Sequence, residues 1–131
     1  MFDSSDFIKT FMGAMAEMDP SSYYDDAIYP ITEEQLSTLP LCVVSAFRFP
    51  SNDDNVTEFS TTIDFWARDE QGQYADTEAK CDLVRAGLDG KVLPLSKAYA
   101  VIYYDDQQPV NDPEIELICT RQSYSGRIFH I

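Results

Sequence analysis

The sequence predicts an α+β domain: a mainly antiparallel sheet of two hairpins, with an N-terminal helix and a central helix packed on one face. Three observations support this fold class. Apolar and polar residues alternate in some segments, apolar residues recur at helical spacing in two others, and polar loops join the strands in pairs. A length of 131 residues suits one domain spanning residues 1–131.

Residues 6–18 are predicted to form the first helix. Its apolar side chains share one stripe, any of residues 4–6 can cap its start, and Asp19-Pro20 ends it. We expect the stripe to pack in the core. It consists of Phe7, Ile8, Phe11, Met12, Met15 and Met18. Residues 21–39 show no steady period and are predicted to form an ordered connection.

A hairpin is predicted next. Residues 41–49 are almost entirely apolar, as in a central strand, and residues 50–55 form a polar loop before a second strand that starts at Val56. In the second strand large apolar groups alternate with polar ones, which indicates one buried face. The Asp and Asn residues of the loop lack the register of a calcium-binding loop, so we expect a solvated turn.

The central helix is predicted over residues 75–88, after a turn at residues 69–72 and before a left-handed cap at Gly90. Its helical wheel has two apolar arcs, so the helix is expected to contact two neighbours. One is the sheet, and the other is the first helix or a second subunit. One arc holds Ala75, Ala79, Leu83 and Ala86; the other, where we place the subunit contact, holds Cys81, Val84 and Leu88.

Two further strands are predicted at residues 98–104 and 115–124. A polar segment at residues 105–113 joins them. Ser125-Gly126 breaks the second strand, and residues 127–131 continue extended. The tyrosines of the strand at residues 98–104 are expected to serve a core or an interface, because a tyrosine ring within a strand pattern usually packs against other side chains.

The composition disfavours several classes of function. Twenty-three acidic residues against nine basic ones give a net charge of −14, which opposes binding that neutralises phosphates. No apolar run approaches the ~20 residues of a membrane span, and the acidic N-terminus resembles neither a signal nor a transit peptide. Three widely separated cysteines, Cys42, Cys81 and Cys119, are expected to be buried thiols.

No catalytic motif stands out in the sequence. His130 is the single histidine, no serine or cysteine has the surroundings of an activated nucleophile, and phosphate-binding and zinc-binding signatures are missing. Asp105-Asp106 could act as a carboxylate pair, but a charged strand end is the expected role. We therefore predict a protein with no enzymatic activity, catalytic residues, cofactor or metal.

The order of these segments resembles that of the tail-terminator (tail-completion, head-to-tail joining) proteins of long-tailed bacteriophages. The matching pieces are the amphipathic N-terminal helix, the strand LPLCVVSAF, the polar loop, the strand TIDFWARD, and the helix ADTEAKCDLVRAGLDG leading into KVL. Beyond the N-terminal helix the similarity covers residues 39–124, and residues 21–38 match nothing in that family.

The resemblance implies a subunit of a hexameric ring that ends the tail tube, joins it to the head connector and leaves a channel for DNA. The implied partners are copies of the chain itself, the major tail tube protein and a head-completion or connector protein. DNA passes without specific binding, and no membrane takes part. The implied location is the tail or neck of the virion, assembled in the cytoplasm of a bacterial host.

Two sets of polar residues receive roles on this basis. The loops are expected to reach the tube or the connector through Ser51, Asn52, Asp53, Asp54, Asn55, Asp105 and Asp106. Carboxylates in the channel would let DNA slide, because they repel phosphates. The candidates for this lumen are Asp25, Asp26, Glu33, Glu34, Glu78, Asp82 and Asp89. The alternative for these acids is solubilising charge that faces bulk water.

Two other classes of function remain open. One is another structural protein of the neck or the minor tail, such as a head-completion protein, which would share the ring geometry and the acidity. The other is an acidic DNA mimic or binding module. Mimicry would need carboxylates at phosphate-like spacing, whereas the acids of this chain are spread over loops and helix faces.

Overall fold

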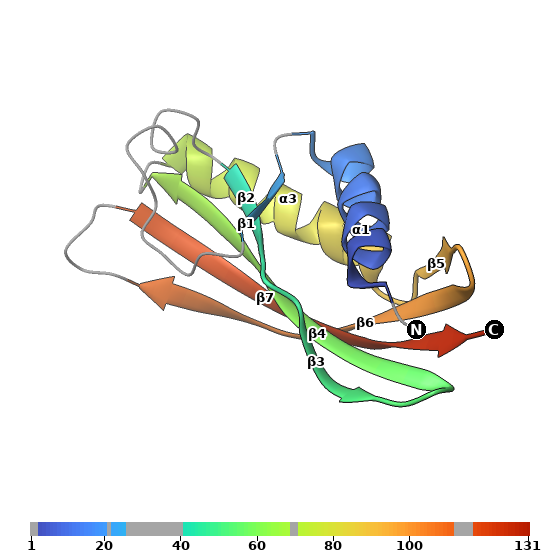
Figure 1. Ribbon diagram of the computed structural model, residues 1–131. Coiled ribbons are helices and arrows are strands. Elements are labelled where there is room, and N and C mark those ends of the chain that lie inside the picture. The colour runs from blue at the N-terminus through green and yellow to red at the C-terminus, as the bar shows by residue number, and fades with distance from the viewer. Residues whose placement is uncertain (1–2, 21, 26–40, 69–70, 112–116) are drawn as a thin grey trace.

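The computed structural model has two layers, a twisted sheet and two helices that cover one of its faces (Figure 1). It describes residues 3–20, 22–25, 41–68, 71–111 and 117–131. The elements are α1 (Ser4–Met18), β1 (Tyr23–Asp25), β2 (Leu41–Ser45), β3 (Arg48–Asn52), β4 (Val56–Arg68), α3 (Gln71–Leu88), β5 (Val92–Leu95), β6 (Ala98–Asn111) and β7 (Leu117–His130). The predicted α+β class, with a mainly antiparallel sheet, is confirmed.

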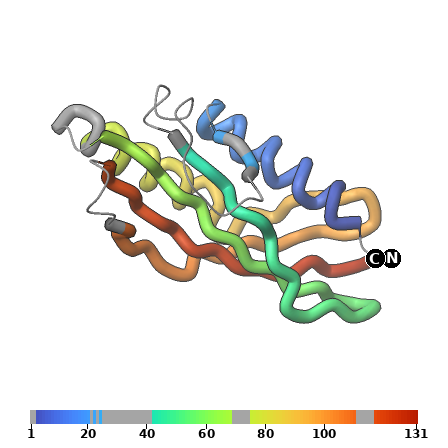
Figure 2. Tube along the Cα trace, turned by 60° about the vertical axis from the view of Figure 1, so that its left-hand side comes forward, coloured from blue at the N-terminus to red at the C-terminus, as the bar shows by residue number. Residues whose placement is uncertain are grey.

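Seven strands form the sheet in the order β1-β2-β4-β7-β6-β5, and β3 also pairs with β4. The three long strands β4, β7 and β6 lie side by side and antiparallel. Among the described strands only β1 and β2 pair in parallel. The β3–β4 hairpin extends past the helical layer (Figures 1 and 2).

Helix α1 packs as its apolar stripe predicts. Its innermost residues Phe7, Phe11 and Met15 are fully buried, and the helix ends where Asp19 takes an extended conformation. The cap is one residue earlier than expected, because the side chain of Asp3 accepts the backbone N–H of Ser5 at 3.0 Å.

Helix α3 confirms the left-handed cap, since Gly90 has φ +78°. The helix begins earlier than predicted: Gln71 and Gly72, expected in a turn, lie in its first turn, while residues 69–70 fall outside the described residues. The apolar arc that contains Cys81, Val84 and Leu88 is buried against the sheet of the same chain. The prediction that these three form the subunit contact is therefore corrected, because they have no surface left to offer.

The two helices also contact each other. Met18 at the end of α1 occupies the space beside Gly87, where an added Cβ would overlap the Met18 sulfur. Lys80 Nζ of α3 lies 3.3 Å from Asp19 Oδ2 just after α1, and that carboxylate is 6% exposed. Of the two neighbours predicted for α3, the sheet and α1 are both present. None of the helices described is long and apolar enough to cross a membrane.

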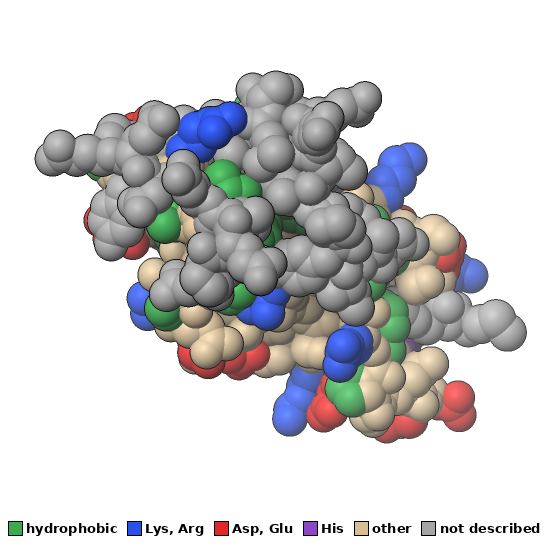
Figure 3. Space-filling model, turned by 90° about the vertical axis from the view of Figure 1, so that its left-hand side faces the viewer, with side chains coloured by type: hydrophobic (Ala, Val, Ile, Leu, Met, Phe, Trp, Pro, Cys, Tyr) green, Lys and Arg blue, Asp and Glu red, His purple; other side chains and the backbone are tan. Residues whose placement is uncertain are grey.

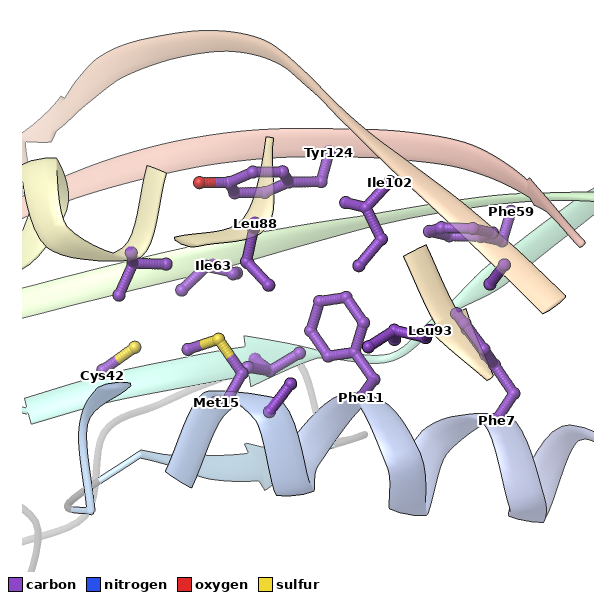
Figure 4. Close-up of a cluster of buried hydrophobic side chains, with 14 of the residues drawn as sticks. Phe7, Phe11, Met15, Cys42, Phe59, Ile63, Leu88, Leu93, Ile102 and Tyr124 are labelled. Carbon is purple, nitrogen blue, oxygen red and sulfur yellow. The ribbon is translucent and has the colours of Figure 1, made fainter. Parts of the chain in front are cut away.

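The core lies between the sheet and the helices. Phe7, Phe11 and Met15 project from α1 toward a layer of side chains on β4, β6 and β7 (Figure 4). The residues that meet them include Phe59, Ile63, Ile102, Tyr124 and Leu88.

The strand predicted at residues 41–49 is divided into β2 and β3 by residues 46–47. At this break Phe47 turns toward α1, and its ring centroid lies 4.9 Å from those of both Phe7 and Phe11. These edge-to-face contacts favour the interruption.

The C-terminal strands are longer than predicted. β6 continues beyond Tyr104 to Asn111, so Asp105 and Asp106 lie within a strand rather than a loop, at a register shift between Tyr104 and Asp106. β7 runs without a break through Ser125 and Gly126. β5 was not predicted, and residues 112–116 fall outside the described residues.

Candidate functional site

The face of the sheet opposite the helices, which we call the open face, has a pattern set by the strand register. Cross-strand partners share one side of a sheet, so Ser60 and Glu58 of β4 lie beside Ser125 and Arg127 of β7, and Tyr103 of β6 lies beside Ser125. The alternate residues face the helices instead.

A hollow of about 460 Å³ lies on the open face. Its floor is low because two small residues, Ser60 and Ser125, are registered partners there. Larger side chains surround this floor, and the lining consists of Pro50, Glu58, Phe59, Ser60, Tyr103, Ser125, Gly126 and Arg127. The sheet therefore presents a shallow depression rather than a flat surface.

Apolar side chains continue the open face from this hollow toward the edge strand β5. Tyr103 is 49% exposed, Tyr99 is 41% exposed and Val92 is 54% exposed. The ring of Tyr99 stacks on Phe129 with centroids 5.1 Å apart. We call the surface formed by Val92, Tyr99, Tyr103 and Arg127 the open-face patch.

Arginines concentrate on the same face. Arg48, Arg68, Arg121 and Arg127 all lie there, as the partners of Ser60, Leu117, Asp64 and Glu58. Arg121 holds the buried Asp64 through Nε–Oδ1 and Nη2–Oδ2 contacts of 2.7 Å and 3.0 Å, so this pair belongs to the fold. Arg127 is different: its Nε lies 3.9 Å from Glu58 Oε1, and the side chains of Arg127 and Glu58 are 61% and 46% exposed. Such a pair contributes little and leaves Arg127 available to a partner.

The outer face of α3 is the second exposed surface, on the opposite layer of the domain. The predicted arc of Ala75, Ala79, Leu83 and Ala86 is exposed throughout, and Leu83 is 52% exposed. The acidic residues Glu78, Asp82 and Asp89 are exposed beside this arc. Small side chains at the centre of a helix face allow another surface to approach closely.

The β3–β4 turn is a self-contained polar loop. Asp53 Oδ1 accepts the backbone N–H groups of Val56 and Asn55, each at 2.8 Å, and these bonds lower the pKa of the Asp53 carboxyl. Of the residues predicted to contact the tail tube or the connector, Ser51 and Asn52 belong to β3, and only Asp53, Asp54 and Asn55 form the turn itself. All five are exposed.

Asp105 and Asp106, the other predicted contact residues, lie far from that turn along the sheet, near the register shift of β6. Asp105 Oδ1 accepts a hydrogen bond from Ser125 Oγ at 2.9 Å. The structure thus connects Asp105 with the hollow rather than with a loop.

The residues predicted to line a lumen are only partly placed. Asp26, Glu33 and Glu34 fall outside the described residues, and Asp25 is described only as part of β1. Glu78, Asp82 and Asp89 are exposed on α3 or just after it, and Asp89 Oδ1 accepts the Tyr104 backbone N–H at 3.1 Å. On the side of the domain seen in Figure 3, basic side chains stand among acidic ones in the part that is described.

The three cysteines and His130, residue types that often serve catalysis or metal binding, take part in the packing and hydrogen bonding of the fold. Burial raises the pKa of Cys81 to about 12 and also raises the pKa of Cys42 and Cys119. His130 Nε2 lies 2.7 Å from Thr57 Oγ1, which donates to Asn52 Oδ1 at 2.6 Å. Within the described ranges, no three His, Cys, Asp or Glu side chains are grouped to hold a metal ion.

The surface that sequence reasoning missed is the open-face patch. The alternation in residues 98–104 placed Tyr99 and Tyr103 on one side of a strand, and the prediction left open whether that side was core or interface. Tyr104 packs toward the core, whereas Tyr99 and Tyr103 are exposed. Residues 127–131 are predicted to be extended beyond a break at Ser125-Gly126, but the sequence alone does not give the register that places Arg127 beside Tyr103 and Tyr99.

Comparisons with known proteins bear on the fold. No protein-family model matches the chain, and no curated protein matches its sequence. Among solved structures, the chain is similar to one from the virion of a native gene transfer agent (GTA) particle, with a TM-score of 0.65 and 12% sequence identity. The similarity covers 95% of this chain and 92% of that chain, so the two share the fold of the entire domain.

Proposed function

We propose that this chain is a structural protein of a virion, and specifically a tail terminator: a ring-forming subunit that ends the tail tube and joins it to the head connector. The observation that supports this most is the shared fold with a chain of the GTA virion, over almost the full length of both. The resemblance of the sequence to tail terminators agrees with it and rests on different observations, namely the order and type of residues in individual segments.

The surfaces of the domain suit a ring subunit. A ring with rotational symmetry is closed by contacts between two different surfaces of each copy. The domain has two such exposed surfaces, the open-face patch and the outer face of α3, and they lie on opposite layers. The partners in this proposal are copies of the chain, the tail tube protein and the head connector.

The proposed role needs no catalysis. Binding to the tube or the connector requires exposed polar backbone and side chains at an end of the domain, and the turn at Asp53–Asn55 extends past the helical layer in this way. DNA would pass through the ring without specific contacts, and the net charge of −14 opposes tight binding of phosphates. The protein would reside in the neck or tail of the assembled particle.

A deletion experiment tests the proposal. Removing the gene from a strain that produces the particle should yield separate heads and tails, with tails of irregular length, in negative-stain electron microscopy. Adding the purified protein to such a lysate should restore joined particles. Joined particles with tails of normal length in the deletion strain would show that the proposal is wrong.

The same deletion experiment distinguishes a tail terminator from the main alternative, a head-completion protein. A head-completion protein acts on the head side, so its loss would leave tails of normal length that do not attach. Light scattering with the purified tail tube protein gives a second reading, because a terminator should bind tube ends whereas a head-completion protein should not.

A further inference from the structure

We infer that the open-face patch is the docking site for the outer face of α3 of a second copy of this chain, so that copies join head to tail. This inference rests on the proposed ring and names the two surfaces that close it.

The exposed apolar side chains point to these two surfaces. Five large apolar residues are exposed in the described part of the chain, and one of them, Ile131, is the last residue. Three of the other four, Val92, Tyr99 and Tyr103, lie on the open face, and the fourth, Leu83, lies on the outer face of α3. The three residues on the open face form a cluster, which indicates a contact site. Leu83 adjoins the exposed alanines Ala79 and Ala86, so the outer face of α3 offers a smaller apolar surface.

The charges of the two surfaces are complementary. The open face has the exposed arginines Arg48, Arg68 and Arg127, with Glu58 beside Arg127. The outer face of α3 has the exposed carboxylates Glu78, Asp82 and Asp89, and the exposed basic residue among them, Arg85, lies over the ring of Tyr104. A contact between these surfaces brings opposite charges together, which guides the register and the rate of association.

The shapes of the two surfaces also fit. The hollow of about 460 Å³ between Tyr103 and Arg127 has room for an aliphatic side chain such as Leu83. The alanines beside Leu83 let the helix approach the sheet closely, so that the carboxylates of α3 can reach Arg127. Tyrosine and arginine around a pocket are the residue types that contribute most to protein–protein contacts.

A second copy is the occupant that these observations favour. Each copy has both surfaces, and they lie on opposite layers, so one contact leaves a free surface at each end of the pair. Such a contact repeats until a rotation closes the ring. It also assigns Glu78, Asp82 and Asp89 to the subunit contact rather than to the DNA channel.

Two substitutions test the inference by disabling one surface each. Arg127→Glu reverses the charge of the open-face patch, and Leu83→Glu places a carboxylate in the middle of the outer face of α3. Both residues are exposed, so the circular dichroism spectrum and the thermal midpoint should stay close to those of the wild type. Lys9→Glu and Ala16→Glu on the exposed side of α1 are the matched controls.

The readout is the mass of the full chain by light scattering, alone and on tail tubes. The wild type and the two controls should assemble, whereas each variant alone should remain at the protomer mass of 14.9 kDa. An equal mixture of the two variants should form a pair of protomers and no larger species, because only one intact contact is possible. Arg127→Glu combined with Asp82→Arg in one chain should recover assembly.

The outcomes distinguish this inference from the proposed function. If the wild type assembles and both variants assemble equally well, the ring stands but these surfaces do not form it. If the wild type assembles neither alone nor on tail tubes, the proposed function fails and the inference fails with it.

Discussion

The ring of Phe59 on β4 lies against Gly126, its registered partner on β7. A Cβ added at Gly126 would lie 2.5 Å from Cζ of that ring and would also overlap the backbone oxygen of Val101. The missing side chain of Gly126 thus makes room for an aromatic ring in the core, while the backbone of the same residue lines the hollow on the open face.

Gly126→Ala is therefore expected to destabilise the domain, even though glycine usually weakens a strand. The neighbouring backbone oxygen cannot move away as a side-chain tip could, so we expect a loss of about 1–3 kcal/mol in the free energy of unfolding. Gly13→Ala is the control: no atom lies within 4 Å of an added Cβ, and the helix should gain about 0.5–1 kcal/mol. Urea denaturation measures both, and a Gly126→Ala protein as stable as the wild type would refute the packing argument.

Gln122 is expected to be the most sensitive polar residue of the core. It is fully buried, donates from Nε2 to the backbone oxygen of Cys81 at 3.0 Å, and accepts the Tyr124 hydroxyl at 2.7 Å. Gln122→Leu keeps the volume but leaves that hydroxyl without its acceptor, at a cost of about 1–3 kcal/mol.

A double-mutant cycle checks this explanation. Adding Tyr124→Phe removes the unsatisfied hydroxyl, so the double variant should be more stable than the sum of the single changes predicts. Gln108→Leu, at an exposed position of β6, should change the free energy of unfolding by less than about 0.5 kcal/mol. Strict additivity of Gln122→Leu and Tyr124→Phe would contradict a hydrogen bond between the two side chains.

The three thiols are expected to be unreactive in the folded protein. Burial raises the pKa of Cys81 to about 12 and raises those of Cys42 and Cys119 as well, so almost no thiolate forms at pH 8. Iodoacetamide at pH 8 should label the native chain slowly and the urea-unfolded chain quickly at all three positions. Mass spectrometry of the digested protein locates the label, and rapid native labelling of any one cysteine would contradict its burial.

Asp53 is expected to titrate below 3.8, its ordinary pKa, because the backbone N–H groups of Val56 and Asn55 stabilise the carboxylate. The pKa is lower in the folded state, so the contribution to stability is present above the unfolded pKa and is lost as the pH falls through the folded value. NMR titration of the side-chain carboxyl between pH 2 and 6 measures the midpoint. Asp53→Asn, which cannot titrate, should lack the corresponding part of the acid destabilisation, and a midpoint at or above 3.8 would contradict the hydrogen-bonded turn.

The helices and the strand β4 could be predicted because their patterns are local. The stripe of α1, the alternation of β4 and the glycine after α3 each depend on residues within one element. Which arc of α3 faces inward could not be decided in this way, since both arcs are apolar. In the structure, the arc with the larger side chains Val84 and Leu88 packs against the sheet, and Leu83 of the other arc is exposed to solvent.

The C-terminal strands could not be delimited because their ends depend on distant partners. Asp105 to Asn111 is polar, yet it is paired with β7 and lies in the sheet. Ser125-Gly126 has the composition of a turn, but Phe59 from another strand needs the space at Gly126. The open-face patch was missed for the same reason: its residues come from β5, β6 and β7, and only the register brings them together.

The position of β7 has a kinetic consequence. This strand follows every other described element along the chain, yet it lies between β4 and β6 near the middle of the sheet. Its pairing with β4 joins residues as far apart as Val56 and Phe129. Pairing of residues so distant in the sequence forms slowly, because a long loop of chain must first be closed. During synthesis β4 and β6 leave the ribosome before β7, so they remain without the strand that pairs with both of them. Because Arg127 belongs to that same strand, a nascent chain cannot form the open-face patch before β7 has joined the sheet.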